Sequence, residues 1–269
     1  MSVRGTLGFL GFGNMGRAIA GGLLENGATT AKHLAAYDVD SEKCAHAEVM
    51  GLRVTRSAED LARACDTLVL AVKPQSMDEA VTEIQTVLKP ATLVVSIAAG
   101  ISIGYLQERL GAEFRVVRVM PNTPALVGAG ATGIAPSPNC KAADVETAHA
   151  IFRSIGVSEQ VPESLIDAVT ALSGSGPAYF FYLVECLSRA AVAQGLPKDQ
   201  ADRLASQTLV GAGLLLRDSG ESATILRERV TSRGGTTEAA LKQFECDEFP
   251  KLVESAVAAA VQRSRELGQ

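Results

Sequence analysis

Short, wholly apolar runs alternate with segments of helical periodicity along the first half of the chain. Residues 67–72 read TLVLAV and residues 92–97 read TLVVSI, whereas a strand with one face in water would alternate apolar and polar residues. Between these two runs, residues 77–88 place apolar side chains at helical spacing. Strands that are buried on both faces and alternate with helices are typical of a parallel sheet covered by helices. The pattern therefore predicts an α/β domain with a Rossmann-type parallel sheet.

The pattern changes near residue 141, after which helical periodicity dominates. A chain of 269 residues accommodates two domains, at about 100–200 residues each. We expect an α/β domain over residues 1–160 and an all-helical domain over residues 161–269. The expected strands are residues 6–10, 34–39, 52–55, 67–72, 92–97, 116–120 and 132–135. The expected helices are residues 17–26, 41–50, 58–64, 77–88, 143–155, 166–194, 198–217 and 252–267.

Two of the later helices are too apolar for a surface helix. Residues 178–187 read AYFFYLVECL, and residues 208–216 read TLVGAGLLL. A helix that is apolar on every face must be buried on every face, and about 110 residues do not easily enclose two such helices. Contact with another subunit explains them best, so we expect a homodimer or a larger homo-oligomer. Ordinary buried helices within one chain are the alternative.

The charge balance, the aromatic content and the length of the apolar runs argue against nucleic acid and membranes as partners. The chain has 25 Lys and Arg against 30 Asp and Glu, whereas a surface that follows nucleic acid phosphates needs a basic excess. Trp is absent and aromatic residues make up 4% of the chain, which also disfavours base stacking. No apolar run reaches the roughly 18 residues that a membrane span needs. We therefore expect neither a nucleic acid partner nor membrane insertion.

The cysteines and histidines form no recognisable constellation. Five cysteines and three histidines are scattered singly, without a CxxC pair or a His/Cys cluster. A disulfide framework and a zinc site are both disfavoured, so we expect no metal and a cytoplasmic protein. The apolar stretch after Arg4 has some likeness to a signal peptide. Gly11, Gly13 and Arg17 interrupt that stretch, and a strand, a turn and a helix explain these residues better.

The strongest local motif is GFGNMG at residues 11–16. It follows an expected strand and opens an expected helix, which is the context of the dinucleotide fingerprint. In that fingerprint Gly11 permits the tight turn, Gly13 lets the backbone approach a pyrophosphate, and Gly16 lets the helix pack against the strand. The free N–H groups and the positive dipole end of the helix then face the phosphates. A glycine-rich turn without a ligand is the alternative.

Asp38 is the candidate residue for the ribose of a dinucleotide. The fingerprint is expected to be followed about 20 residues later by an acidic residue that accepts from the ribose hydroxyls. Asp38 ends the second expected strand at that distance, with Asp40 and Lys43 close by. Its carboxylate would accept from a free 2′-OH and repel a 2′-phosphate, which favours NADH. Asp is also an ordinary turn residue at a strand end, so NADPH stays open.

Three further loops follow expected strands, at the positions where open α/β sheets bind ligands. They are residues 71–74 (AVKP), 96–100 (SIAAG) and 120–124 (MPNTP). Small residues in the first two loops let a nicotinamide ring lie flat against the backbone. Two prolines fix the third loop, in which Asn122 is a candidate hydrogen-bonding group.

Two unusual stretches precede helices in the second part of the chain. Residues 173–177 read SGSGP, and residues 231–237 read TSRGGTT. In the latter, glycines expose successive N–H groups, hydroxyls flank them, and the dipole of the following helix points at whatever binds. This arrangement predicts a pocket for a carboxylate or a phosphate. A Ser/Thr-capped helix without a ligand is the alternative.

The motifs together resemble those of the pyrroline-5-carboxylate reductases. The resemblance rests on GFGNMG, AVKP, SIAAG, RVMPNTPALVGAG, DAVTALSGSGPAYFFYLVE and VTSRGGTTEAAL, and it runs essentially end to end. It implies NAD(P)H-dependent reduction of L-1-pyrroline-5-carboxylate to L-proline, the final step of proline biosynthesis. It also implies that the helical domain binds the substrate and forms an interlocked homodimer, with dimers that assemble into a decamer.

The resemblance also assigns roles to individual residues. Thr237 is expected to place its hydroxyl against the ring nitrogen of the substrate, as the catalytic residue. The substrate carboxylate is expected on Ser232 and on the backbone of Gly234, Gly235 and Thr236. The cofactor is expected to contact Leu10, Gly11, Phe12, Gly13, Asn14, Met15, Asp38, Ala71, Val72, Lys73, Pro74, Ile97, Ala98 and Ala99.

Three residues depart from the usual pattern of this family. Ala58 stands where asparagine is frequent, which weakens contacts with adenine. Arg233 replaces a frequent proline, which makes the loop less rigid but adds a positive charge beside the carboxylate. Asp38 stands where smaller or polar residues often allow NADPH.

The expected reaction is consistent with what the sequence lacks. No His, Cys or Lys constellation for nucleophilic or general-base catalysis is visible, and reduction of a protonated imine needs none. A β-hydroxyacid dehydrogenase shares the two-domain plan, but it uses a lysine early in the first long helix of its second domain, where this chain reads GPAYFFYLVE. A non-catalytic NAD-sensing dimer would need no anion pocket at residues 232–237. We therefore expect an oxidoreductase that transfers hydride to a cyclic imine.

Overall fold

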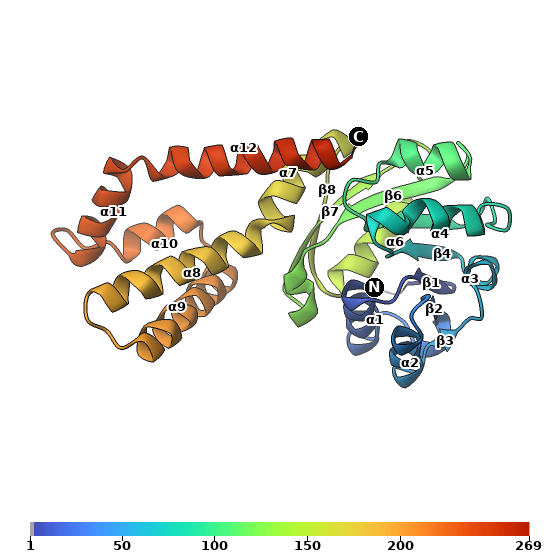
Figure 1. Cartoon of the computed structure of the whole chain (residues 1–269), viewed down its shortest axis with the longest axis horizontal. Coiled ribbons are helices and arrows are strands. Elements are labelled where there is room, and N and C mark those ends of the chain that lie inside the picture. The colour runs from blue at the N-terminus through green and yellow to red at the C-terminus, as the bar shows by residue number, and fades with distance from the viewer. Residues whose placement is uncertain (1–2, 269) are drawn as a thin grey trace. The chain divides into compact units, whose positions relative to one another are not determined.

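The computed structural model describes residues 3–268, which fold into two compact units. The first unit runs to Ser175 and also takes in the stretch from Ala260 onward, and the second unit is Gly176–Ala259. The contacts thus divide the chain after Ser175, whereas the sequence suggested a boundary at residue 160. They also return the end of the last helix to the first unit. Figure 1 labels the elements of both units.

The first unit is built on an eight-stranded sheet with the order β3-β2-β1-β4-β5-β6-β7-β8. All neighbouring strands are parallel except β6 and β7, which pair antiparallel. The strands are β1 (Leu7–Leu10), β2 (Leu34–Tyr37), β3 (Arg53–Val54), β4 (Thr67–Leu70), β5 (Leu93–Ser96), β6 (Arg115–Met120), β7 (Gly130–Pro136) and β8 (Gly156–Gln160).

The predicted Rossmann-type parallel sheet is confirmed, and the antiparallel pair is a detail that the pattern did not indicate. A parallel neighbour needs a crossover of about a dozen residues or more, usually with a helix. Only residues 121–129 join β6 to β7, and they contain the short 3-10 helix η3 (Thr123–Val127). The link is too short for a crossover, so the chain turns back on itself. The sheet is therefore mostly, but not entirely, parallel.

Helices cover both faces of the sheet, which explains the continuous apolar runs. Every residue of β1, β4 and β5 is buried. Along β5, Leu93 and Val95 belong to one core and Val94 belongs to the other. The first core also receives α1, α2 and α6, and the second receives α3, α4 and α5. These helices are α1 (Asn14–Glu25), α2 (Ser41–Val49), α3 (Ala58–Ala64), α4 (Met77–Ile84), α5 (Ile103–Leu110) and α6 (Ala142–Arg153).

Side-chain caps start three of these helices where the sequence changes from loop to periodic pattern. Asp40 accepts from the N–H of Glu42 at the start of α2, Ser57 from Asp60 at the start of α3, and Ser102 from Tyr105 at the start of α5. Such caps satisfy backbone donors that have no partner inside the helix. α5 was not among the expected helices, although its Ser cap is followed by buried Ile103, Leu106 and Leu110 at helical spacing.

β8 is the second element that the sequence did not indicate. It forms the edge of the sheet, where residues 156–160 read GVSEQ and Ser158 is the buried residue of the strand. An edge strand is paired along only one side of its backbone. The side chains of β8 are mostly exposed, so the strand has little hydrophobic signal in the sequence. The expected boundary at residue 160 coincides with the end of this strand.

The helical part of the chain is more interrupted than its periodicity suggested. The long helix expected over residues 166–194 consists of α7 (Ile166–Val169), the π-helical turn η5 (Thr170–Gly174) and α8 (Gly176–Ala193). It is followed by α9 (Lys198–Ser219), α10 (Ala223–Arg229), α11 (Thr236–Cys246) and α12 (Phe249–Leu267). Short 3-10 turns elsewhere are η1 (Ala31–His33), η2 (Pro74–Ser76) and η4 (Glu163–Leu165).

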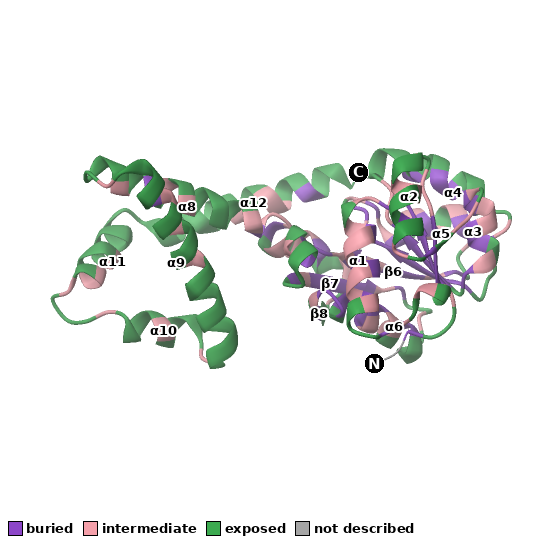
Figure 2. Cartoon of the chain, turned by 90° about the horizontal axis from the view of Figure 1, so that it is seen from below, coloured by how far each residue is buried: buried purple, intermediate pink, exposed green. Residues whose placement is uncertain are grey.

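The second unit leaves a large amount of apolar surface uncovered. In α8, Phe180, Phe181 and Tyr182 are 56%, 65% and 62% exposed. In α9, Leu204 and several later apolar residues are also exposed, and Figure 2 shows the helices of this unit largely in the colour of exposed residues. Contiguous apolar surface of this kind marks an interaction site. The burial predicted for α8 is therefore not supplied by the described residues of a single chain.

Close packing of α1 on the turn between α6 and β8 explains one of two adjacent glycines. A Cβ at Gly22 would lie 2.5 Å from the carbonyl oxygen of Ser154 and 2.6 Å from Cγ2 of Ile155. The Nδ2 atom of Asn26 donates to the same Ser154 carbonyl at 2.8 Å. At Gly21, one residue earlier, the nearest atom to a Cβ would be Cε of Met50 at 3.9 Å. Gly22 is thus required by packing, and Gly21 is not.

The two substitutions are expected to change the free energy of unfolding in opposite directions. Gly22→Ala should destabilise the protein by about 1–3 kcal/mol, because the new methyl group overlaps backbone. Gly21→Ala should stabilise it by about 0.5–1 kcal/mol, because alanine has the higher helix propensity and the space is open. Urea unfolding followed by circular dichroism measures both. Equal effects of the two variants would contradict this packing.

Candidate active site

The first unit brings four predicted cofactor segments to one edge of its sheet. β2, β1, β4 and β5 are parallel neighbours, so the residues that follow them lie at the same edge. The chain proceeds from β1 to β2 on one side and continues from β4 on the other, so the sheet has its topological switch point between β1 and β4. Open α/β sheets bind ligands there. The four segments are Asp38 and residues 10–15, 71–74 and 97–99.

The glycine turn packs directly on the loop that follows β4. Gly11 has φ +92°, and a Cβ there would lie 2.7 Å from the carbonyl carbon and oxygen of Ala71. A Cβ at Gly16 would lie 3.1 Å from the carbonyl oxygen of Gly11. Gly13 differs, because a Cβ at this position would meet no atom within 4 Å. The turn is closed toward the sheet and open in front of Gly13.

The start of α1 can accept an anion. Gly13 is the N-cap, it forms no side-chain cap, and the first turn carries no acidic residue. The N–H groups of Asn14 and Met15 have no acceptor inside the helix, and the helix dipole favours negative charge there. Leu10 and Phe12 are buried, so the turn presents their backbone rather than their side chains. The open space and the donor set fit the pyrophosphate of a dinucleotide.

Asp38 lies where the sequence placed it, but the protein already uses its carboxylate. Oδ2 accepts from the N–H of Phe12 at 2.7 Å, and Oδ1 accepts from the N–H of Asp40 at 3.0 Å. The Asp38 side chain is 8% exposed. A carboxylate oxygen has two acceptor lone pairs, so Oδ2 retains capacity for one further hydroxyl donor. Asp38 therefore fastens the glycine turn to the end of β2 while keeping an acceptor for a ligand.

Lys43 compensates the charge of this carboxylate. Its Nζ atom lies 3.4 Å from Oδ1 of Asp38 and 3.4 Å from Oδ2 of Asp40. Burial lowers the pKa of Lys43, but the two carboxylates together raise it by more, so the pKa is above its ordinary value. Lys43 thus stays charged and bridges two acids at the edge where the ribose is expected.

The loops after β4 and β5 continue the hydrogen-bond pattern of the sheet. The N–H of Ala71 donates to the carbonyl of Leu10 at 2.8 Å, and the N–H of Ile97 donates to that of Leu70 at 3.1 Å. Ala98 is buried, whereas Lys73 and Ala99 are exposed. Apart from Lys73, the residues named in these two loops have short or apolar side chains. They lie at the ends of β4 and β5, beside the switch point between β1 and β4.

Asn122 does not present a free amide to a ligand. Its Nδ2 atom donates to the carbonyl of Ser173 at 3.0 Å, its Oδ1 atom accepts from the N–H of Ala131 at 2.9 Å, and the residue is 8% exposed. The side chain joins the end of β6 to the π-helical turn and to β7. The sequence singled out Asn122 as a candidate ligand group, and the structure gives it an internal role instead.

Sequence reasoning missed a partly buried ion pair at the end of the loop that follows β5. Nη1 of Arg118 lies 3.2 Å from Oε1 of Glu163, and the same oxygen accepts from the N–H of Ile103 at 2.7 Å. The Arg118 side chain is 11% exposed. Arg118, which lies between Val117 and Val119 in β6, was the available signal, because a charge at such a position needs a partner.

The predicted anion loop of the second unit precedes α11. Gly235 is the N-cap of this helix, and Gly234 has φ +71°. The N–H of Gly235 donates to the carbonyl of Ser232 at 3.0 Å, and the N–H of Gly234 donates to Oε2 of Glu238 at 2.6 Å. These two N–H groups are thus engaged within the loop. The helix leaves the N–H groups of its first turn, which starts at Thr236, for another acceptor.

Glu238 places its own carboxylate on this loop, where it accepts from the Gly234 N–H. The Gly234 N–H, and in second place Lys242, hold the pKa of Glu238 below its usual value. Nζ of Lys242 lies 3.2 Å from the other carboxylate oxygen. Thr237 is half-buried beside it, and Ser232 and Thr236 are exposed. A ligand carboxylate would therefore meet the first-turn N–H groups and the Ser232 hydroxyl, next to a charge that Lys242 balances.

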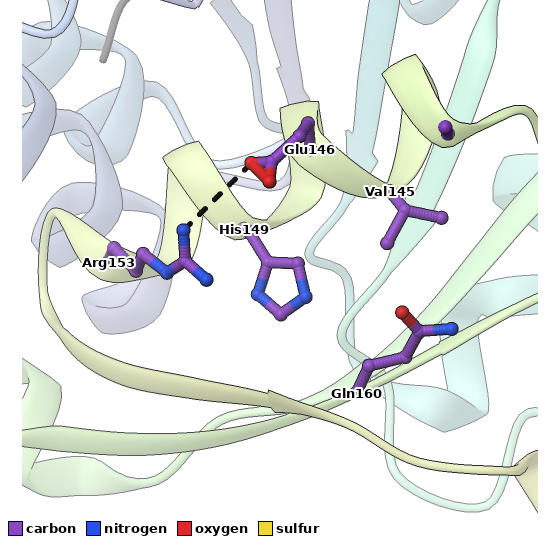
Figure 3. A pocket seen from close by; sticks show the side chains of 6 residues that line it. Val145, Glu146, His149, Arg153 and Gln160 are labelled. Atoms are coloured by element: carbon purple, nitrogen blue, oxygen red, sulfur yellow. Dashed lines mark ion pairs between the residues drawn. The ribbon is translucent and has the colours of Figure 1, made fainter.

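Two hollows are present in the first unit. One of about 470 Å³ lies between α1 and η3 and includes Asn14 of the glycine turn. The other, of about 420 Å³, lies between α6 and β8 and contains none of the predicted site residues. Figure 3 shows its lining residues Val145, Glu146, His149, Arg153 and Gln160.

The histidine in the second hollow serves the fold. His149 Nδ1 lies 2.7 Å from the Ser158 hydroxyl, which joins α6 to β8. Burial, and then the nearby Arg153 charge, lower the pKa of His149.

Across residues 3–268, no three His, Cys, Asp or Glu side chains are grouped so as to hold a metal ion. Within the same residues, no helix is both long and apolar enough to cross a membrane.

Comparison with known proteins places both parts of the chain in one family. Residues 163–267 match the family model described as pyrroline-5-carboxylate reductase dimerisation. Residues 6–100 match the model described as NADP oxidoreductase, coenzyme F420-dependent. The pyrroline-5-carboxylate reductase of Pseudomonas aeruginosa is 41% identical over 264 residues, which cover 98% of this chain and 97% of that protein.

Solved structures agree with this assignment. A pyrroline-5-carboxylate reductase from Coxiella burnetii superposes with a TM-score of 0.94 at 36% identity, covering 98% of this chain and 99% of that one. The pyrroline carboxylate reductase of Plasmodium falciparum, solved with NADP bound, has a TM-score of 0.84 at 33% identity, and both chains are covered completely. The chain belongs to the pyrroline-5-carboxylate reductase family.

Proposed function

We propose that this protein reduces L-1-pyrroline-5-carboxylate to L-proline with NAD(P)H, as an oxidoreductase that acts on a CH–NH group in proline biosynthesis. The observation that carries the proposal is the end-to-end match to the Pseudomonas aeruginosa reductase, which includes the glycine turn and the loop before α11. In this proposal, residues 1–160 bind the cofactor, and residues 161–269 bind the substrate and form the dimer.

The cofactor is assigned to the edge of the sheet at the switch point. The pyrophosphate would take the N–H groups at the start of α1, in the open space before Gly13. The adenosine ribose would meet Asp38, and the nicotinamide would lie against the small-residue loops after β4 and β5. When bound, the reduced nicotinamide supplies the hydride. The proposed contacts are those of Leu10, Gly11, Phe12, Gly13, Asn14, Met15, Asp38, Ala71, Val72, Lys73, Pro74, Ile97, Ala98 and Ala99.

The substrate is assigned to the loop before α11. Its carboxylate would be bound by Ser232, Gly234, Gly235 and Thr236, where the first-turn N–H groups and the positive end of the helix dipole favour an anion. The Thr237 hydroxyl, one residue into the helix, would hydrogen-bond the ring nitrogen. Because the Gly234 N–H donates to Glu238 in this chain, the substrate carboxylate would have to replace Glu238 at that donor.

The chain itself contributes position rather than an acid or a nucleophile. A protonated imine carbon already attracts hydride, so the protein needs to hold the two reactants in line and to exclude water. Thr237 orients the nitrogen. Because a threonine hydroxyl is a poor general acid, the proton is expected to come with the substrate or from water.

Oligomerisation follows from the second unit. The exposed aromatic side chains of α8 lie within the segment that matches the dimerisation model. We propose a homodimer that covers this surface, with assembly into a decamer. The five cysteines are free thiols, which fits a reducing cytoplasmic location.

Removal of the Thr237 hydroxyl is expected to slow the reaction without weakening the binding of the cofactor. Thr237→Ala should lower kcat by about 10- to 100-fold, the cost of one hydrogen bond to a charged group. The dissociation constant for NADH should stay within about twofold, since Thr237 belongs to the substrate loop. Stopped assays of proline and NADH fluorescence titration measure the two quantities. Thr237→Ser, which keeps the hydroxyl, is the control, and an unchanged kcat in Thr237→Ala would remove this residue from the mechanism.

Asp38 is expected to make NADH the better reductant. In assays at 340 nm with pyrroline-5-carboxylate, kcat/KM should be higher with NADH than with NADPH, because a 2′-phosphate would meet a carboxylate. Asp38→Asn keeps an acceptor for the Phe12 N–H and removes the charge. It should shift the ratio of kcat/KM toward NADPH by about tenfold.

Glu48→Gln removes an exposed charge from the other end of α2 and should leave the cofactor ratio unchanged. A higher kcat/KM with NADPH in the unaltered protein would overturn the role given to Asp38. If neither NADH nor NADPH supports proline formation, the proposed reaction itself would be overturned.

A further inference from the structure

The loop between β5 and α5, residues 97–102, is fixed at both ends. At its start, the Ile97 N–H donates to the carbonyl of Leu70, and the Ala98 N–H lies 3.4 Å from the Ser96 hydroxyl oxygen. At its end, the Ile103 N–H donates to Glu163, which Arg118 holds from β6. The middle of the loop lies between these two anchors, and the Ile101 N–H donates to the carbonyl of Ala98 across it at 3.4 Å.

The last turn of α12 packs on that middle part. Gly100 has φ +78°, and a Cβ there would lie 2.7 Å from the carbonyl oxygen of Leu267 and 3.2 Å from its carbonyl carbon. From the other side, a Cβ at Gly268 would lie 3.3 Å from the carbonyl oxygen of Gly100. Backbone thus meets backbone, without room for a side chain at Gly100.

The end of α12 is itself anchored to the first unit. The Ser264 hydroxyl donates to Oδ1 of Asp167 in α7 at 2.7 Å, and Ser264 is 8% exposed. Nε of Arg265 lies 4.0 Å from the other carboxylate oxygen of Asp167. α12 begins in the second unit and ends in the first. Its final turns therefore act as a fixed support rather than as a loose end.

We propose that Gly100 and the last turn of α12 position the nicotinamide-binding loop. Gly100 directly follows the residues assigned to the nicotinamide, and its carbonyl and Cα face the Leu267–Gly268 turn instead of the cofactor. The support keeps Ile97, Ala98 and Ala99 in the arrangement that a flat ring requires. Gly100 is thus a positioning residue, and the inference rests on the cofactor placement proposed above.

The test compares Gly100→Ala with Gly27→Ala in the full-length protein. Both glycines have positive φ, but a Cβ at Gly27 would meet no atom within 4 Å, and Gly27 follows α1 rather than a cofactor strand. Gly27→Ala therefore reproduces the backbone strain without the contact. Gly100→Ala should raise the dissociation constant for NADH and the KM for NADH by about tenfold, with the KM for pyrroline-5-carboxylate unchanged. Gly27→Ala should change none of these constants.

A second variant covers the case in which Gly100→Ala does not fold. Ser264→Ala leaves the loop intact and removes the bond that holds α12 to Asp167, so it should raise the same two NADH constants by about threefold. An unchanged NADH affinity in folded Gly100→Ala would overturn the proposal. If that variant is unfolded, an unchanged affinity in Ser264→Ala would overturn it. An equal rise in the KM values for both reactants would also overturn it, because it would indicate general damage.

The binding measurement separates this inference from the proposed reaction. NADH titration needs no substrate and no turnover, so it reports the support of the loop even if pyrroline-5-carboxylate is not reduced. An unaltered protein that binds NADH but forms no proline would contradict the proposed function and leave the role of Gly100 to be decided by the titration.

Discussion

Backbone packed against backbone at the switch point is the constraint on which the cofactor site depends. Gly11 can lie against Ala71 only because it has no side chain and adopts φ +92°. This approach brings the start of α1 beside the ends of β4 and β5, so the anion-binding N–H groups and the small-residue loops share one edge. Asp38 then secures the turn through the Phe12 N–H. The group proposed to select the ribose therefore also holds the turn in place.

The second unit follows a different principle, because its helices are not covered within the described part of one chain. The exposed aromatic residues of α8 require a partner surface, and the loop before α11 belongs to the same unit. In the proposed reaction, the substrate held by that loop must reach the nicotinamide. The proposal therefore links assembly and catalysis through the segment that matches the dimerisation model. α12, which ends on Gly100, contributes to both units.

Most of the α/β fold could be predicted from the sequence, since buried strands such as TLVLAV and the GFGNMG turn carry strong local signals. The edge strand β8 could not, because GVSEQ is mostly exposed, and the antiparallel β7 depends on the length of a link rather than on a pattern. The helix α5 was missed although Ser102 and its apolar spacing were visible. The bonds of Asp38 to Phe12 and of Gly234 to Glu238, and the contact of Gly100 with Leu267, arise only when distant or turning segments meet. No local pattern indicates them.

The central claim is that a reduced pyridine ring on the first unit is faced by a small cyclic acid held at the start of α11. A crystal structure of the assembled protein with oxidised cofactor and proline tests it most directly. The account predicts the carboxylate of proline at the first-turn N–H groups of α11, the ring nitrogen at the Thr237 hydroxyl, and the adjacent ring carbon in contact with C4 of the nicotinamide. Proline bound at another place, out of contact with the nicotinamide, would contradict the account.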